Sequence, residues 1–339
     1  MAPERKPRTR GAIRRFLVLV QTEGSQSLQD FFEIKQLVEA KAPDIRVVVV
    51  SNRSHSVATL RALPPLPTLI VSPYQLNKGF TPDRGVIHAG QLITKDVQQA
   101  LLEKAKIPVP PSVVLAPGVQ LDSAVFGDLV IVKPLEPAKT SHGDWIQLRR
   151  TTDVTYEPPE TLPAHHPARL APMLAQRFID TGPKATSHRV LTLYGEPLYA
   201  LRVASKVAMP DLAGSDDELR QASAASNGDL RTVEFFEDEA IFDLARRVHA
   251  VAPDVPLKGV DVLRDVRDGS LWVIEFNPGG NTWGFSTRSG ARTRRRMQTE
   301  FPEDHPDAEA AGRRNYIKHL DGFRRAADVL IEQTRRCAR

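Results

Sequence analysis

Hydrophobic and polar positions along the first 90 residues predict strands and helices in alternation. Residues 16–20, 47–50 and 68–71 are short, uninterrupted apolar runs, as is typical of buried strands. After Ser27, apolar residues recur at helical spacing, which predicts an amphipathic helix. Its apolar positions are Phe31, Ile34, Leu37 and Val38. Strand–helix–strand units favour a parallel sheet with right-handed crossovers, so we expect a small α/β domain here.

The pattern changes after residue 90. A helix is predicted over residues 95–106, and the prolines that follow it end it firmly. Period-two and continuous apolar runs then predict strands over 128–133, 145–148 and 173–179 and hairpins over 189–203 and 257–277. Amphipathic helices are predicted over 237–251 and from Ile317 to Ile331. Loops are expected over 150–171 and 209–229, which are rich in Pro, Thr or small polar residues.

Composition excludes several classes of protein. The chain of 339 residues is 41% hydrophobic and 26% charged, which is typical of a soluble globular protein of about two domains. No apolar run approaches the length of a membrane span, and no secretory signal is evident. The single cysteine, Cys337, cannot form an internal disulfide or a cysteine-based metal site. We therefore expect a cytoplasmic protein with no membrane partner.

The net charge of +5 belongs to one end of the chain. Residues 1–15 contain six basic side chains and one acidic one, so the rest of the chain sums to zero. A basic domain face that tracks nucleic acid would leave the remainder positive. We interpret residues 1–15 as a solvated, flexible arm, and an arm that binds RNA or a partner stays open as an alternative.

The hairpin over 257–277 carries the clearest chemistry. If residues 267–269 form a three-residue loop with Gly269 left-handed, Asp261 faces Glu275 across the strands, and Asn277 shares their face. The opposite face is then expected to pack in the core; its residues are Val260, Val262, Trp272, Ile274 and Phe276. Two carboxylates and an amide oxygen suit a hard cation such as Mg²⁺. A polar, solvent-facing hairpin is the alternative.

Basic side chains near predicted strand ends are candidates for phosphate binding. Lys133 follows a buried strand and precedes a polar loop that contains Ser141 and Gly143, whose N–H groups could cap phosphate oxygens. Lys95 opens the predicted helix. Arg189 and Arg202 lie on the first hairpin, where burial would require an anionic partner. Each alone is a weak signal, because such residues are often surface side chains.

The order of these pieces resembles the ATP-grasp superfamily, and in particular its carboxylate–amine ligases of the D-alanine–D-alanine ligase, ribosomal-protein glutamate ligase and glutathione synthetase type. Lys95, the IPVP at 107–110, VIVKP around Lys133, MLAQRFIDTG at 173–182, and GVDVL followed by IEFN carry the resemblance. It implies an α/β fold with α+β lobes: a leading Rossmann-like domain, then ATP bound between two α+β lobes.

The resemblance also implies roles for individual residues. Lys95 and Lys133 would contact phosphates, together with Ser141 and Gly143, and Asp261, Glu275 and Asn277 would hold Mg²⁺. The hinge strand would pair with adenine, and Asp180 would replace the family's ribose-binding carboxylate. The implied hinge residues are Gln176, Arg177, Phe178, Ile179 and Asp180. The implied catalytic residues are Arg189, Arg202 and Asn281.

The implied activity is ATP-dependent ligation of a carboxylate to an amine or thiol through an acyl phosphate. ATP and Mg²⁺ are the implied cofactors, with two metal ions and with Mn²⁺ as a substitute. The substrates would be small-molecule or peptide carboxylates and amines. Two alternatives remain: a small-molecule kinase on the same fold, and a non-catalytic nucleotide- or RNA-binding protein. A homodimer also stays open.

Four segments follow from this interpretation. Residues 1–15 are the basic arm and residues 16–90 the N-terminal α/β domain. Residues 91–172 form the central lobe, and residues 173–339 form the C-terminal lobe with its closing helix.

Overall fold

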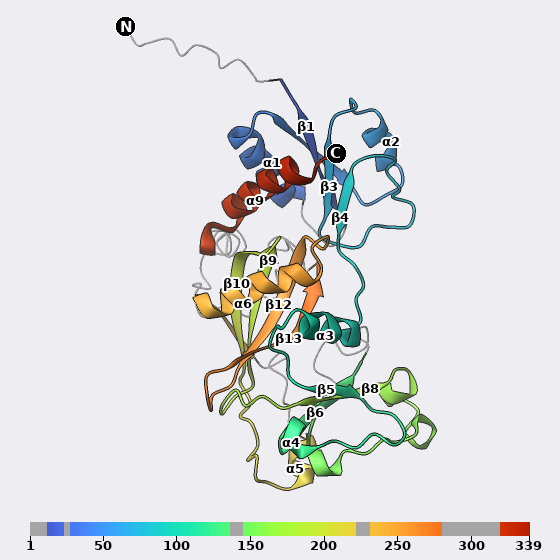
Figure 1. The fold of residues 1–339 in the computed structure, drawn as a ribbon, viewed down its shortest axis with the longest axis vertical. Helices are drawn as coiled ribbons and strands as arrows, with labels where there is room; N and C mark the ends of the chain where they lie inside the picture. Colours follow the sequence, from blue (N-terminus) through green and yellow to red (C-terminus); the bar gives the residue numbers. More distant parts are fainter. Residues whose placement is uncertain (1–11, 24–27, 136–144, 222–230, 280–318) are drawn as a thin grey trace, which may run out of the picture.

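The computed structural model describes residues 12–23, 28–135, 145–221, 231–279 and 319–339. Three sheets follow one another along the long axis of the molecule (Figure 1). The sheet built from the N-terminal residues lies at one end, and the two later sheets lie in the middle and at the other end. We name them the first, second and third sheet in the order in which the chain enters them.

The first sheet is parallel, with the strand order β2-β1-β3-β4. Its elements are β1 (Arg15–Gln21), α1 (Leu28–Lys41), β2 (Ile45–Ser51), α2 (Ser56–Arg61), β3 (Thr68–Ser72) and β4 (Val86–Ala89). Leu17, Leu19, Phe31 and Ile34 are fully buried. The three predicted strands and the first helix are confirmed. The short α2 and β4 were not predicted, because neither is long enough to show a period.

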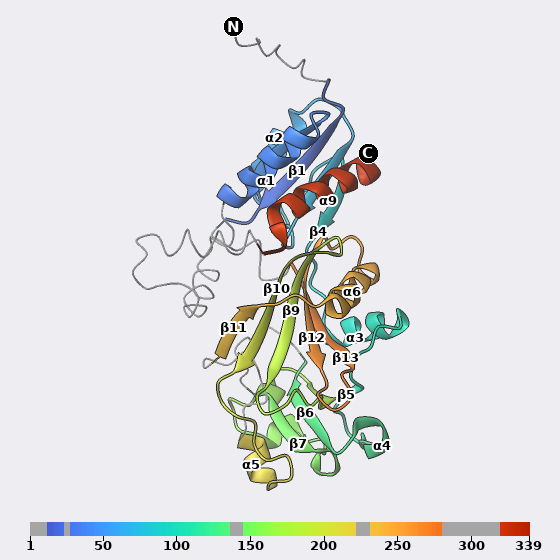
Figure 2. The ribbon, with the colours of Figure 1, turned by 90° about the vertical axis from the view of Figure 1, so that its left-hand side faces the viewer.

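The C-terminal helix α9 (Gly322–Cys337) returns to the first sheet and packs beside α1, as Figure 2 shows. Phe323 and Leu330 share one core cluster with Leu17 and Phe31. The backbone N–H of Thr68 donates to the carbonyl of Arg339, the last residue, at 3.1 Å. The closing helix therefore joins the two ends of the chain in a single core.

The second sheet is antiparallel, with the order β5-β8-β6-β7. Its strands are β5 (Ser112–Val114), β6 (Leu129–Pro134), β7 (Gln147–Arg150) and β8 (Met173–Arg177), preceded by α3 (Lys95–Lys104) and α4 (Ser123–Phe126). Side chains alternate across β6, so Val130 and Val132 pack in a small core, and Lys133 points to the other face. Residues 151–172 contain three short 3₁₀ turns, where a plain loop was predicted.

The third sheet is antiparallel, with the order β11-β10-β9-β12-β13. Its strands are β9 (Thr186–Leu193), β10 (Glu196–Ser205), β11 (Arg231–Phe235), β12 (Leu257–Arg264) and β13 (Leu271–Pro278), and α5 (Asp216–Gln221) and α6 (Glu239–Val248) accompany them. The apolar side of α6 covers one face, where Val190, Val260 and Phe276 are buried. We call the opposite face, which carries Arg189 and Asp261, the site face.

A β-bulge interrupts each hairpin of the third sheet. In β12–β13 the pairing runs from Arg264–Leu271 to Val262–Val273 and then resumes at Asp261–Glu275, so Ile274 is the extra residue. Val273 therefore joins the core, fully buried, and Trp272 moves to the site face opposite Leu263. The prediction that Trp272 and Ile274 lie in the core was wrong, because the bulge shifts the alternation by one residue.

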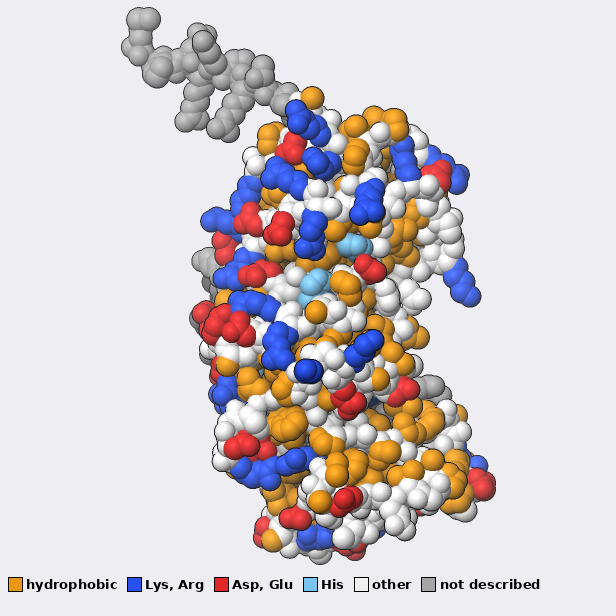
Figure 3. All heavy atoms as spheres, in the orientation of Figure 1, with side chains coloured by type: hydrophobic (Ala, Val, Ile, Leu, Met, Phe, Trp, Pro, Cys, Tyr) orange, Lys and Arg blue, Asp and Glu red, His pale blue; other side chains and the backbone are white. Residues whose placement is uncertain are grey.

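Within the described segments, no helix is both long and apolar enough to cross a membrane. On the face shown in Figure 3, basic and acidic side chains are interspersed over the first and third sheets. Many charged side chains of the described residues form ion pairs; examples are Lys41 with Asp328 and Arg246 with Glu239.

Candidate active site

Charged side chains from four elements meet on the site face. Arg189 of β9 donates to both oxygens of Asp261 on β12, from Nε to Oδ1 at 2.6 Å and from Nη2 to Oδ2 at 2.5 Å. Asn277 Nδ2 donates to Asp261 Oδ2 at 3.1 Å and to Glu275 Oε1 at 3.4 Å. Lys95 Nζ, at the start of α3, lies 3.8 Å from Glu275 Oε2. The predicted pairing of Asp261 with Glu275 is confirmed.

The two carboxylates differ in electrostatic environment. Burial raises the pKa of Asp261, although the Arg189 guanidinium works in the opposite direction, and Glu275 adds a further rise. Burial alone would also raise the pKa of Glu275, but Lys95, Lys133 and Arg189 together hold it below its ordinary value. At neutral pH Glu275 is therefore an anion held between cations.

The residues fit a hard cation by their donor chemistry. Asp261 and Glu275 offer carboxylate oxygens and Asn277 an amide oxygen, and Mg²⁺ commonly takes one or two protein carboxylates along with phosphate oxygens. No group of three or more His, Cys, Asp or Glu residues that could hold a metal occurs among the described residues. A metal ion at this site would therefore need further oxygen ligands, such as those of a nucleotide. It would also require Arg189 to give up its hydrogen bond to at least one oxygen of Asp261.

Lys133 is the most deeply buried of the basic residues at the site. Its side chain lies at 8% exposure, and Nζ donates to Gln176 Oε1 at 2.8 Å. Burial, and after it the neighbouring charge of Lys95, lower its pKa to about 8. Among the described residues Lys133 forms no ion pair within 4 Å. A buried cation whose direct partner is neutral is unfavourable unless an anion completes the site.

Gln98, which was not predicted as a site residue from the sequence, positions α3. Gln98 is buried at 6% exposure; its Oε1 accepts the backbone N–H of Phe276 at 3.0 Å, and its Nε2 donates to the carbonyl of Ile93 at 2.9 Å. These bonds tie the first turn of α3 to β13, directly beside Glu275. Lys95 opens this first turn of α3, so Gln98 places the lysine beside the carboxylate. A polar residue at a core position of an amphipathic helix was the available signal.

Replacing Gln98 with Leu is expected to lower the free energy of unfolding by about 1–3 kcal/mol, because the buried N–H of Phe276 loses its acceptor. ATP binding should weaken as well, since Lys95 is no longer held near Glu275. Urea unfolding and calorimetric titration with ATP measure the two effects. Gln36→Leu, on the exposed side of α1, is the matched control. Equal stability of the two variants would contradict the assignment.

The predicted hinge begins in the last two residues of β8 and connects the second and third sheets. Gln176 turns its side chain to Lys133. The backbone N–H of Phe178 donates to Leu129 O at 3.0 Å, and that of Val266 donates to Asp180 O at 2.8 Å. In the described part of the chain, the carbonyl of Phe178 and the N–H of Ile179 form no backbone hydrogen bond. Because these two groups belong to one trans peptide, they point to opposite sides of the hinge strand.

Two hinge side chains serve the local structure. Arg177 lies on the opposite face of the second sheet from Lys133, and its guanidinium carbon is 5.8 Å from the centre of the Trp272 ring. Asp180 Oδ1 accepts the N–H of Gly182 at 2.9 Å, which fixes the turn after the hinge. The stacked pair of Arg177 and Trp272 is a second feature that sequence reasoning missed, because the bulge at Ile274 decides where Trp272 points.

Arg202 does not join the cluster. Its cross-strand partner on β9 is His188, so it lies on the face that α6 covers, opposite to the face of Arg189. There it pairs with Glu234 at 3.1 Å, and both side chains are about half exposed. The prediction that Arg202 holds a phosphate is corrected by this geometry. The cause is a bulge between Pro197 and Tyr199, which shifts the register of the hairpin by one residue.

Three predicted site residues, Ser141, Gly143 and Asn281, lie outside the described residues. A residue that was not predicted, Tyr199, lies on the site face near Arg189, and burial raises its pKa. Tyr74, from the loop after β3, lies against the end of β13: a Cβ added to Gly279 would be 3.3 Å from its ring.

Comparisons with known proteins give similarity at the level of structure. No model of a known protein family matches the sequence, and no curated protein matches it. Among solved structures, D-cycloserine synthetase DcsG is 16% identical with a TM-score of 0.43, over 89% of this chain and 99% of that chain. D-alanine–D-alanine ligase from Bacillus anthracis, complexed with ATP, is 14% identical with a TM-score of 0.42, over 95% of this chain and 99% of that chain.

A third similar structure is the ATP-grasp ligase PsnB complexed with precursor peptide PsnA2 and AMPPNP. It is 15% identical with a TM-score of 0.45, over 94% of this chain and 98% of that chain. All three similarities are distant and extend along most of each chain.

Proposed function

We propose that the protein is an ATP- and Mg²⁺-dependent ligase that joins a carboxylate to an amine or thiol through an acyl phosphate. The observation that carries the proposal is the charge of the site. Lys95, Lys133 and Arg189 converge on two carboxylates, Asp261 and Glu275, and leave one positive charge in excess around a buried lysine. A polyphosphate would supply the missing negative charge.

The side chains divide the work between binding and orientation. Lys95 and Lys133 hold phosphate oxygens, and the backbone of the hinge near Gln176 to Ile179 pairs with the adenine edge. Asp261, Glu275 and Asn277 would hold Mg²⁺, which when bound offsets the negative charge of the phosphates. Asp180 keeps one carboxylate oxygen available for the ribose, since Gly182 uses the other. Arg189 orients an anionic substrate beside the transferring phosphoryl group.

The chemistry requires no protein nucleophile. An oxygen of the substrate carboxylate attacks the γ-phosphorus, the bond to the β–γ bridging oxygen breaks, and ADP leaves. The amine then attacks the carbonyl carbon of the acyl phosphate, phosphate leaves, and the amine gives up a proton. Positioning and electrostatic stabilisation supply the rate. A guanidinium group suits a planar carboxylate, so we expect substrates with free carboxylates, such as amino acids or peptides.

The decisive experiment distinguishes the ligase from a kinase on the same fold. Protein, Mg²⁺ and ATP are incubated with pools of amino acids, peptides and other carboxylic acids, with hydroxylamine as a generic amine. We expect acid-dependent ADP release together with a hydroxamate, because hydroxylamine intercepts an acyl phosphate. ADP release with a stable phosphorylated alcohol and no hydroxamate would reject the ligase and establish the kinase.

The pH dependence of ATP binding should report Lys133. Its pKa of about 8 means that the free protein loses the charge of Lys133 as the pH rises above that value. The association constant for ATP is therefore expected to be level below pH 8 and to fall by up to tenfold per pH unit above it. In Lys133→Arg the guanidinium stays charged, so the same titration should be level from pH 7.5 to 9.5. Equal slopes for the two proteins would remove Lys133 from the phosphate site.

A further inference from the structure

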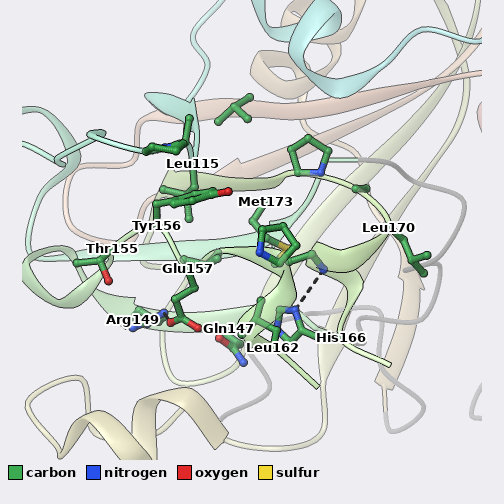
Figure 4. Close-up of a pocket in the computed structure, with 18 of the residues that line it drawn as sticks. Leu115, Gln147, Arg149, Thr155, Tyr156, Glu157, Leu162, His166, Leu170 and Met173 are labelled. Carbon is green, nitrogen blue, oxygen red and sulfur yellow. Dashed lines mark hydrogen bonds and ion pairs between the residues drawn. The ribbon is translucent and has the colours of Figure 1, made fainter. Parts of the chain in front are cut away.

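A cavity lies away from the cluster of charged side chains at the candidate active site. It has a volume of about 650 Å³ and lies between the second sheet and residues 151–172, partly open to solvent (Figure 4). This volume falls within the range of about 300–1,000 Å³ that small-molecule sites occupy. The proposed ATP-dependent activity gives it no role.

The cavity is on the other face of the sheet from the candidate active site. Side chains alternate along β6, so Val132 lines the cavity, and its neighbour Lys133 points to the opposite face. On β8, Met173 lines the cavity, and Gln176 points to the opposite face, where it accepts a hydrogen bond from Lys133. A molecule in this cavity would therefore be separated from the ATP site by the thickness of one sheet.

One side of the cavity is apolar. Leu115, Val132 and Met173 line it from the sheet, and Leu162 and Leu170 line it from residues 151–172. Leu170 is 60% exposed, although it is a large hydrophobic side chain. Burial of this surface by an apolar ligand would be favourable, at about 25 cal/mol per Å² of apolar area.

The other side of the cavity is polar and contains two arginines. Figure 4 shows Arg149 beside Gln147 and Glu157. Arg149 is nearly buried, with 12% of its side chain exposed, and Nη2 donates to the carbonyl of Asp153 at 2.9 Å. Its Nη1 is 3.7 Å from Glu157, too far for a hydrogen bond, and its Nε is buried without a partner. Two of its three nitrogen atoms therefore lack an acceptor.

Arg220 of α5 lines the cavity close to Arg149 and forms no ion pair with any described residue. The other charged groups nearby have partners of their own. Arg150 pairs with Asp216 at 2.9 Å, and Asp153 accepts a hydrogen bond from Thr152 Oγ1 at 3.1 Å. Glu157 is the single acidic residue of the lining, so the lining has two positive charges and one negative charge.

We propose that this cavity binds a small amphipathic anion, with its apolar body against Leu115, Met173 and Leu162 and its carboxylate between Arg149 and Arg220. Guanidinium groups bind carboxylates strongly, and Nη1 of Arg149 together with the guanidinium of Arg220 provides the donors, since Nε of Arg149 is buried. The apolar side and the two arginines line one cavity, so a single ligand contacts both.

A matched pair of probes tests this assignment. Naphthalene-1-acetate and naphthalene-1-acetamide have nearly the same shape and differ in charge, and calorimetry or ligand-observed NMR measures their binding to the full-length protein. We expect the acid to bind at least tenfold more tightly than the amide, because a hydrogen bond to a charged group contributes about 1.5–3 kcal/mol. Arg149→Gln and Arg220→Gln should each reduce that preference; Arg220 is exposed, so its replacement leaves the fold intact.

A blocking variant tests the location. Ala168 lines the cavity from residues 151–172, and Ala168→Trp should abolish binding of both probes and leave ATP binding unchanged. Arg61→Gln, an exposed arginine near α2 that pairs with Asp83, is the control and should bind both probes like the unaltered protein. The proposal is overturned if the unaltered protein binds neither probe, if acid and amide bind equally, or if Ala168→Trp binds them undiminished.

Discussion

Replacing Glu275 with Gln should reduce Mg²⁺-dependent turnover by about a thousandfold. Glu275 is the anion that faces Lys95 and is held charged by Lys95, Lys133 and Arg189. Losing one carboxylate from a metal site costs about 4 kcal/mol of transition-state stabilisation, and each 1.36 kcal/mol is tenfold in rate. The amide keeps the shape of the side chain, but it leaves Lys95 and the buried Lys133 without their nearest anion, so the melting temperature should fall as well.

For the same variant we expect no loss in the affinity for ATP when no metal is present. Without the charge of Glu275, Lys95 and Lys133 lack their nearest anion, so ATP without metal should bind as tightly as before or more tightly. Turnover assays and calorimetry in EDTA separate the two effects. Glu234→Gln, on the opposite face of the same sheet, is the control and should change neither. Full Mg²⁺-dependent activity of Glu275→Gln would remove this residue from the metal site.

Replacing Arg189 with Met should destabilise the protein by about 3–5 kcal/mol as well as inactivate it. The substitution leaves Asp261, whose side chain is 7% exposed, without the guanidinium that binds both of its oxygens. Breaking a buried pair by removing one partner has this cost, because the remaining charge is uncompensated. Urea unfolding measures the loss. Adding Mg²⁺ should restore part of it, since Asp261 is then available to the cation.

A double substitution separates the structural from the catalytic role. Arg189→Met combined with Asp261→Leu removes both charges, and replacing a buried pair by apolar groups is often nearly neutral for stability. We expect the double variant to recover most of the lost stability, to gain nothing from Mg²⁺ and to remain inactive. If it recovers activity along with stability, the pair serves the fold alone.

The strands and helices that the sequence predicted correctly are those with a long, regular pattern. The apolar run of β1, the stripe of α6 and the stripe of α9 repeat the same period several times, so local spacing determines them. The short α2, β4 and β11 were missed because they contain too few residues to show a period. The 3₁₀ turns of residues 151–172 were missed for the same reason.

The registers of the two hairpins could not be predicted from local sequence patterns. In β12–β13 the turn is one residue out of the predicted register, and the bulge at Ile274 restores the pairing of Asp261 with Glu275. In β9–β10 a bulge between Pro197 and Tyr199 has the reverse effect and moves Arg202 away from Arg189. Neither bulge has a signal in the sequence, because each depends on how the strand packs against its neighbours.

The sequence by itself determined which residue types could serve a nucleotide site and the order in which they occur. It also determined that Glu275 and Asn277 share a face, since period-two alternation within one strand is local, but the bulge at Ile274 decided that Asp261 faces them. The tertiary structure decided that α3 and β6 bring Lys95 and Lys133 to those carboxylates, and that Gln98 holds α3 there. It also decided that Arg202 faces α6 and that α9 closes the first sheet. These outcomes depend on contacts between residues far apart in the chain, which no local period encodes.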